Sequence, residues 1–131
     1  MIRDFTRKEL IRLSEAEKSL EDLCEAVNEK FPIFIICGHR NKEDQELAVI
    51  SGHSKVHYPN SKHNSLPSKA VDLCPYPINW DDRKAFYEMY KVVMATAQEM
   101  GIKIRAGADF NQDGDLTNDK WVDRPHFEIE D

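Results

Sequence analysis

The sequence predicts an α+β domain with a small antiparallel or mixed sheet of about four strands and helices on one side. Segments with the period of a helix are interspersed with short apolar runs of strand length, in the order α-β-α-loop-β-α-β-loop-β. The 131 residues, 40% of them hydrophobic, suffice for one domain with a buried core. We therefore expect a single domain over residues 1–131.

The first predicted elements are a helix and a strand. Residues 14–30 have a one-sided apolar pattern, and Ser14 and Glu17 have the spacing of a capping box. Residues 33–37, IFIIC, form a continuous apolar run that suits a strand covered on both faces.

The next region predicts a second helix and a long loop. Residues 42–50 have a helical pattern, with Leu47, Ala48 and Ile50 expected to face inward. Residues 51–68 have no periodicity and contain three His and two Pro. A loop of this length within a compact domain often has a function.

The second half predicts a long helix between strands. Asp81 or Asp82 can cap a helix that runs to about Met100, and Gly101 is its natural stop. The remaining strands are expected at 70–74, 102–106 and 126–130.

Composition excludes several classes of protein. The net charge of −6 opposes binding to nucleic acid through phosphates, and Arg7, Lys8 and Arg12 are expected on a solvated helix surface. No stretch is long and apolar enough for a membrane span, and the first residues lack a secretory signal. We therefore expect synthesis in a cytoplasm, no membrane partner and a monomer. The odd number of cysteines argues against a disulfide framework, and two of them are expected to be buried thiols: Cys37 and Cys74, with Cys24 as the third.

Three residues form a candidate zinc site. Asp72 lies in the predicted strand AVDLC, where burial of a carboxylate is costly without a partner. His63 precedes it and His126 opens the last strand. Two imidazoles and a carboxylate are typical of catalytic zinc sites, and Asp123 is the best-placed general base. From spacing alone, satisfied surface or core groups remain an alternative interpretation.

Three short motifs resemble a known peptidase family. Ser61-Lys62-His63, Ala70-Val71-Asp72 and Asp123-Arg124-Pro125-His126 are similar to the S-x-H, A-x-D and (D/E)-x-x-H elements of the D-alanyl-D-alanine carboxypeptidases and dipeptidases. They resemble more closely the phage branch, the L-alanyl-D-glutamate endopeptidases that serve as endolysins. The family also has an Arg after the first strand and a later Gln, which Arg40 and Gln45 match.

The resemblance implies a function and roles for these residues. His63, Asp72 and His126 would bind zinc, and Asp123 would be the base. Arg40 would steady the substrate or the oxyanion, and Ser61 and Gln45 would contact the substrate. The fold would be that of the Hedgehog and DD-peptidase domains.

The implied reaction is hydrolysis of the L-alanyl-D-glutamate bond in the peptidoglycan stem peptide. The enzyme would be made in the host cytoplasm and reach the wall through a membrane lesion. One alternative is a D,D-carboxypeptidase or dipeptidase of the same family. Another is a non-catalytic, metal-stabilised binding module, as the Hedgehog domains illustrate.

An acidic loop suggests a second cation site. The run from Asp109 to Gly114 follows the start of a calcium loop, D-x-N-x-D-G, but Lys120 stands where a bidentate Glu is expected. An Asx-rich turn is an equally good interpretation. The candidate calcium ligands are Asp109, Asn111, Asp113 and Asp115.

The other histidines have weaker patterns. His39 is expected in a turn. His53 and His57 lie in the irregular loop, where exposure is the default interpretation.

Overall fold

The computed structural model describes residues 3–52, 54–107 and 125–130, and it confirms the α+β class. Within these ranges no helix combines the length and apolar character needed to cross a bilayer. The elements in chain order are α1 (Arg7–Ser14), α2 (Lys18–Lys30), β1 (Ile33–Cys37), α3 (Lys42–Ile50), β2 (Ala70–Pro75), α4 (Arg83–Met100), β3 (Ile104–Ala106) and β4 (His126–Ile129).

Within the described ranges the sheet has four strands in the order β1-β2-β4-β3, and every pair is antiparallel. The two central strands align Val71 with Phe127 and Asp72 with His126. Because side chains alternate along a strand, Val71 and Phe127 share one face and Asp72 and His126 the other. The first pair belongs to the main hydrophobic core.

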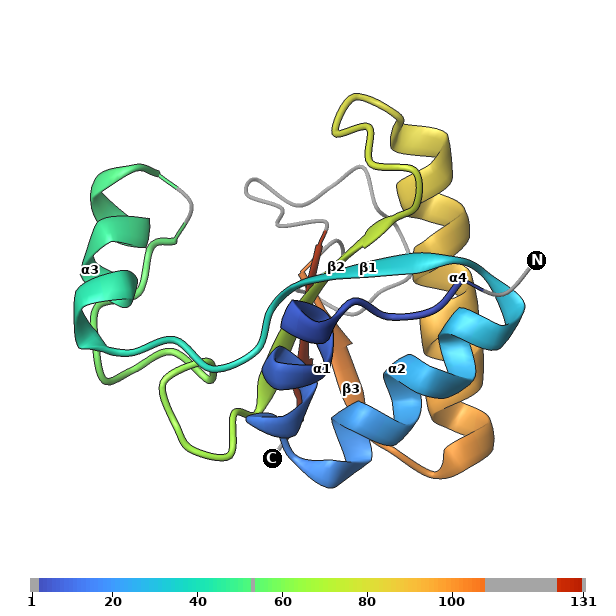
Figure 1. Cartoon of the computed structure of the whole chain (residues 1–131). Coiled ribbons are helices and arrows are strands. Elements are labelled where there is room, and N and C mark those ends of the chain that lie inside the picture. The colour runs from blue at the N-terminus through green and yellow to red at the C-terminus, as the bar shows by residue number, and fades with distance from the viewer. Residues whose placement is uncertain (1–2, 53, 108–124, 131) are drawn as a thin grey trace.

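Three helices cover the core face of the sheet. The core combines Leu13 of α1, Leu20 and Leu23 of α2, and Met89 and Val93 of α4 with the inward residues of the strands. In Figure 1, α1, α2 and α4 gather around the sheet, whereas α3 stands apart from them. The opposite face of the two central strands is therefore left for Asp72 and His126.

The predicted inward face of α3 is wrong for Leu47 and Ile50, whereas Ala48 is half-buried. Leu47 is 62% exposed and Ile50 is 81% exposed. The fully buried residue of this helix is the polar Gln45. Because α3 stands apart from the other helices, Leu47 and Ile50 have no core to face.

The predicted helix over residues 14–30 corresponds to α2, which begins only at Lys18, after the separate helix α1. The capping box is formed by Thr6 and Glu9 at the start of α1, not by Ser14 and Glu17. Glu17 precedes α2 without a capping side-chain hydrogen bond. Ser68 separates the two helices, because its backbone pairs with residues 15–17. The sequence shows no sign of this long-range contact.

Strand β1 lies at the edge of the sheet, and side chains satisfy its outer backbone groups. Glu9 accepts a hydrogen bond from the Ile35 N–H at 2.8 Å, and Arg12 donates to the Ile35 carbonyl at 2.7 Å. Asn28 accepts from the Ile33 N–H. These contacts block the exposed edge that would otherwise pair with another strand. The strand is not covered on both faces, since Ile36 is only half-buried.

Predictions for the second half agree closely with the structure. Asp82 caps α4 by accepting from the Ala85 N–H, and Gly101 ends the helix at φ 71°, in the left-handed region that favours glycine. Strand β3 begins two residues later than the predicted 102, and β4 ends one residue before the predicted 130. These small shifts leave the order of elements unchanged.

Candidate metal centre

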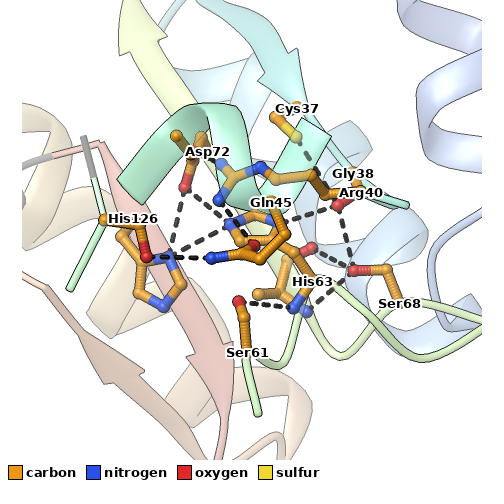
Figure 2. Close-up of polar contacts among 12 residues, drawn as sticks. Cys37, Gly38, Arg40, Gln45, Ser61, His63, Ser68, Asp72 and His126 are labelled. Carbon is orange, nitrogen blue, oxygen red and sulfur yellow. Dashed lines mark hydrogen bonds and ion pairs between the residues drawn. The ribbon is translucent and has the colours of Figure 1, made fainter. Parts of the chain in front are cut away.

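His63, Asp72 and His126 converge on the face of the sheet opposite the core (Figure 2). Asp72 Oδ1 lies 3.1 Å from His63 Nε2 and 3.2 Å from His126 Nδ1, and the two nitrogens are 3.2 Å apart. Strand pairing sets Asp72 beside His126, and the loop before β2 supplies His63. All three side chains are buried.

The protons of both imidazoles are directed away from this cluster. His63 Nδ1 lies 2.6 Å from the Gly38 carbonyl, which can only accept, so Nδ1 carries the proton. His126 Nε2 lies 2.8 Å from Glu128 Oε1, which accepts in the same way. In the neutral rings His63 Nε2 and His126 Nδ1 therefore turn lone pairs toward the Asp72 carboxylate.

This donor set fits a divalent metal ion. Three buried acceptor atoms face one another, and acceptors at this separation need a cation between them. Two imidazole nitrogens and a carboxylate oxygen are common zinc ligands, and their second-side hydrogen bonds to a carbonyl and a carboxylate are typical of metal-bound histidines. The cluster therefore has the chemistry of a metal centre.

Without a metal, protons take the place of the cation. Burial opposes the charge of His63, but Asp72 outweighs burial and raises the pKa of His63 to about 10. Burial also opposes the charge of His126, yet hydrogen bonds to Asp72 and Glu128 raise its pKa to about 9. Despite burial, the two histidines hold the pKa of Asp72 well below its usual range. A divalent ion would replace protons with equal charge.

Arg40 and Gln45 form a buried network behind Asp72. Arg40 Nη2 lies 3.4 Å from Asp72 Oδ2, and its Nη1 donates to Gln45 Oε1 at 3.0 Å. The amide nitrogen of Gln45 donates to Ser54 and to the Val56 carbonyl. Gln45 is 0% exposed, so in this conformation it holds Arg40 rather than facing an open surface.

Backbone contacts fix the loop that carries His63. The His63 carbonyl accepts from the Arg40 N–H at 2.8 Å, and Ser61 Oγ accepts from the His63 N–H at 3.2 Å. The Lys69 N–H donates to the Lys62 carbonyl, which joins the two ends of the run from His63 to Ser68. Ser61 thus positions His63 here.

A pocket of about 460 Å³ opens beside Asp72. Its walls are mostly apolar, and Arg40 and Asp72 are the charged groups among the described residues that line it. Cys37 also lines the pocket and is half-buried, whereas the sequence predicted a buried core thiol; Cys74 is buried as expected. The described lining consists of Ile36, Cys37, Arg40, Ala48, Asp72, Trp80 and Pro125.

Several predicted site residues lie outside the described ranges. These are Asp123, His53 and the candidate calcium ligands Asp109, Asn111, Asp113 and Asp115. The predictions for them stay predictions.

Of the described histidines, His39 and His57 lie outside the metal cluster. His39 Nδ1 is 2.9 Å from the Ser65 carbonyl, as suits a turn residue. The exposed His57 pairs with Glu46. Arg40 contacts Asp72 and Gln45.

Sequence reasoning missed two groups that orient the histidines. The Gly38 carbonyl has no signature in the sequence, because every residue has a backbone carbonyl. Glu128 does have a signature: in the alternating run HFE, it shares the face of His126.

Fold and site together define an α+β domain with a His/Asp/His centre able to hold a metal ion. The family model of the phage L-alanyl-D-glutamate peptidases matches residues 1–130, and the chain belongs to this family. This membership confirms the resemblance that the three motifs indicated.

Two individual proteins are similar to the chain. The L-alanyl-D-glutamate peptidase of Escherichia phage T5 is 34% identical over 84 residues, which are 62% of this chain and 61% of that protein. The match thus spans less than two thirds of the relative. The crystal structure of the Serratia marcescens L-Ala D-Glu endopeptidase ChiX superposes with a TM-score of 0.75 at 22% identity, over 96% of this chain and 89% of that one. At this identity the second match supports the fold.

Proposed function

We propose that the chain is a zinc-dependent peptidase that hydrolyses the L-alanyl-D-glutamate bond of the peptidoglycan stem peptide. The observation that carries the proposal is the convergence of three buried acceptor atoms, from His63, Asp72 and His126, beside a pocket. Membership in the phage L-alanyl-D-glutamate peptidase family supports the choice of substrate.

The residues of the site are of two kinds: proposed metal ligands, and groups that orient those ligands. His63 Nε2, Asp72 Oδ1 and His126 Nδ1 would be the ligands. Bound zinc supplies Lewis acidity, lowering the pKa of water and polarising a carbonyl. Gly38 and Glu128 fix the imidazole tautomers, so the ligand nitrogens are preset for the metal.

Arg40 would stabilise the negative charge that develops during hydrolysis. Its guanidinium lines the pocket and is held by Gln45 and Asp72, so substrate binding need not order a free side chain. A fixed cation there stabilises negative charge on the carbonyl oxygen of the scissile bond. Asp123, three residues before His126 in the sequence, would accept the proton of the attacking water and pass it to the leaving amine.

The pocket suits a short peptide. A volume of about 460 Å³ is within the range of small-molecule sites, about 300–1,000 Å³. Apolar walls from Ala48 and Trp80 match the methyl group of alanine, beside Arg40 and the proposed ligand Asp72. The proposed partner is the stem peptide, and the net charge of −6 opposes binding to nucleic acid. We propose that the chain acts as a monomer and is released to the wall from the host cytoplasm.

Digestion of purified muropeptides tests the proposal. Zinc-loaded protein is incubated with them, and mass spectrometry identifies the new amino terminus. D-Glutamate is the expected result. D-Alanine instead would make the chain a D,D-carboxypeptidase or dipeptidase, and intact muropeptides with zinc bound would favour a metal-stabilised binding module.

Asp123 separates catalysis from metal binding. Replacement of Asp123 by Ala removes the proposed base but no proposed ligand, so lysis of permeabilised cells should be lost while zinc content stays near one per chain. The control is Asp81→Asn, an exposed acidic residue outside the site. Full activity of the Asp123 variant would refute the assigned base.

The calcium prediction remains part of the proposal. Calcium bound at Asp109–Asp115 would lie in sequence just before Asp123 and would act on the catalytic turn. After chelation and zinc repletion, calcium should raise activity or melting temperature. No change in either quantity refutes a calcium site.

A further inference from the structure

Glu128 lies beside the metal centre on the same face of the sheet. It is two residues from His126 on β4, and its Oε1 accepts from His126 Nε2 at 2.8 Å. Its side chain is 13% exposed, so the carboxylate is largely withdrawn from water. A carboxylate in this place costs free energy unless cations or donors hold it.

Cations from two other segments surround this carboxylate. Lys62 Nζ lies 3.6 Å from Glu128 Oε2 and also donates to the Ile129 carbonyl. Arg105 on β3 is the cross-strand partner of Glu128. The buried charge is thus balanced from the loop on one side and from β3 on the other.

Lys62 connects the two histidines through this carboxylate. It precedes His63 in the sequence, and its side chain reaches across to the strand that carries His126. The same loop residue therefore fixes the segment of one ligand and the carboxylate that orients the other. A simple surface ion pair would have no contact with either imidazole.

We propose that Glu128 is a positioning residue of the metal centre, and that Lys62 holds it in place. This inference rests on the proposed zinc site. Glu128 accepts a hydrogen bond from the Nε2–H group of His126. This bond fixes the ring with Nδ1 toward Asp72 and raises the basicity of Nδ1. Its effect is on metal affinity, and it touches neither the substrate nor the metal.

Zinc affinity of the metal-free chain tests the proposal, measured by competition with a chromophoric chelator. Glu128→Val removes the acceptor with a residue that suits a strand, and it should weaken zinc binding by about 10–100-fold. Glu128→Gln keeps a neutral acceptor and should lose less, about threefold, because a charged acceptor bonds roughly twice as strongly. The matched control is Glu130→Val, at an exposed position just beyond the same strand, which should stay within about twofold of the parent.

Two further measurements separate positioning from general stability. The Co²⁺ form should show a changed visible spectrum in Glu128→Val but not in Glu130→Val. Lys62→Met should weaken zinc binding less than Glu128→Val, since it leaves the acceptor in place. A purely structural role would lower the melting temperature of the metal-free chain without changing zinc affinity or the cobalt spectrum.

Unchanged zinc affinity in a folded Glu128→Val variant would overturn the inference. Should that variant fail to fold, Glu128→Gln decides, and parental affinity there would overturn it equally. Failure of the proposed function has a different signature: the parent chain would bind zinc and leave muropeptides intact. Even then, the zinc affinities of the parent chain, Glu128→Gln and Glu128→Val can fall in the predicted order.

Discussion

Glu9 and Asp72 are both buried carboxylates, but their partners differ in kind. Glu9 accepts from Arg3 through both oxygens, at 2.8 and 3.0 Å, and from the backbone N–H groups of Thr6 and Ile35. Every one of these partners is a fixed donor of the protein. Asp72 faces one nitrogen of each imidazole ring. The other nitrogen of each neutral ring carries the proton and donates it in a hydrogen bond to the Gly38 carbonyl or to Glu128.

The difference distinguishes a structural carboxylate from a metal-binding one. Burial opposes the charge of Glu9, yet its hydrogen bonds hold its pKa below the ordinary value, and the group is satisfied by the fold itself. Arg40 lies 3.4 Å from Asp72 Oδ2, but Oδ1 is satisfied only when protons or a metal ion sit between it and the histidines. Burial alone thus says little about function, whereas the identity of the partners decides it.

Replacement of Asp72 by Asn should have the largest effect. It removes the only anionic ligand of the proposed site, so muropeptide hydrolysis should fall by on the order of a thousandfold. Circular dichroism should show a folded chain, since the core lies on the other face of the sheet. Full activity of this variant would contradict the assignment of Asp72 as a metal ligand. Asp81→Asn is the control.

Replacement of Glu9 by Gln should have the opposite pattern. It leaves Arg3 without its ion pair, and the free energy of unfolding should fall by about 3 kcal/mol, measured by urea denaturation. Zinc content and hydrolysis by the folded fraction should persist. Because the pKa of Glu9 is lowered on folding, its stabilising effect should be complete above about pH 4.5 and lost at lower pH. Equal acid sensitivity of parent and variant would count against this role.

The metal site should respond at the alkaline end instead. In the metal-free chain the raised pKa values of His63 and His126 contribute stability that is complete below about pH 6.5 and is lost as pH rises through about 9 to 10. The melting temperature should fall by about 5 °C or more between pH 7 and 10, and zinc should prevent the fall. A flat profile without metal would contradict the assigned partners.

Gln45 should give the smallest effect. Gln45→Leu removes the acceptor that holds Arg40, so kcat/KM should drop by about tenfold through misplacement of the guanidinium. Zinc content should not change, because no ligand loses a partner. Loss of zinc in this variant would assign Gln45 to the metal centre rather than to Arg40.

Local signals in the sequence predicted much of the fold. The pattern of α4, with Asp82 at its start and Gly101 at its end, depends on neighbouring residues alone, and it was found. The sequence did not reveal that Ser68 pairs with the segment between α1 and α2, since that contact joins distant segments. Nor did it reveal that α3 stands apart, because Leu47 and Ile50 have an apolar pattern whether or not a core lies beneath them.

The candidate site shows the same division. Motifs predicted that His63, Asp72 and His126 act together, and the structure brings them together. The orienting groups were harder to find, because the Gly38 carbonyl has no side-chain signature and Glu128 lacks a motif. Glu9 was not singled out at all, although it is the carboxylate on which β1 depends.

Zinc content after dialysis, compared between the parent chain and Asp72→Asn by mass spectrometry, tests the central claim most directly. The convergence of three acceptors predicts about one zinc per parent chain and almost none in the variant. Equal zinc content in both proteins would mean that the metal binds elsewhere in the chain. Absence of zinc from both would contradict the proposed zinc site.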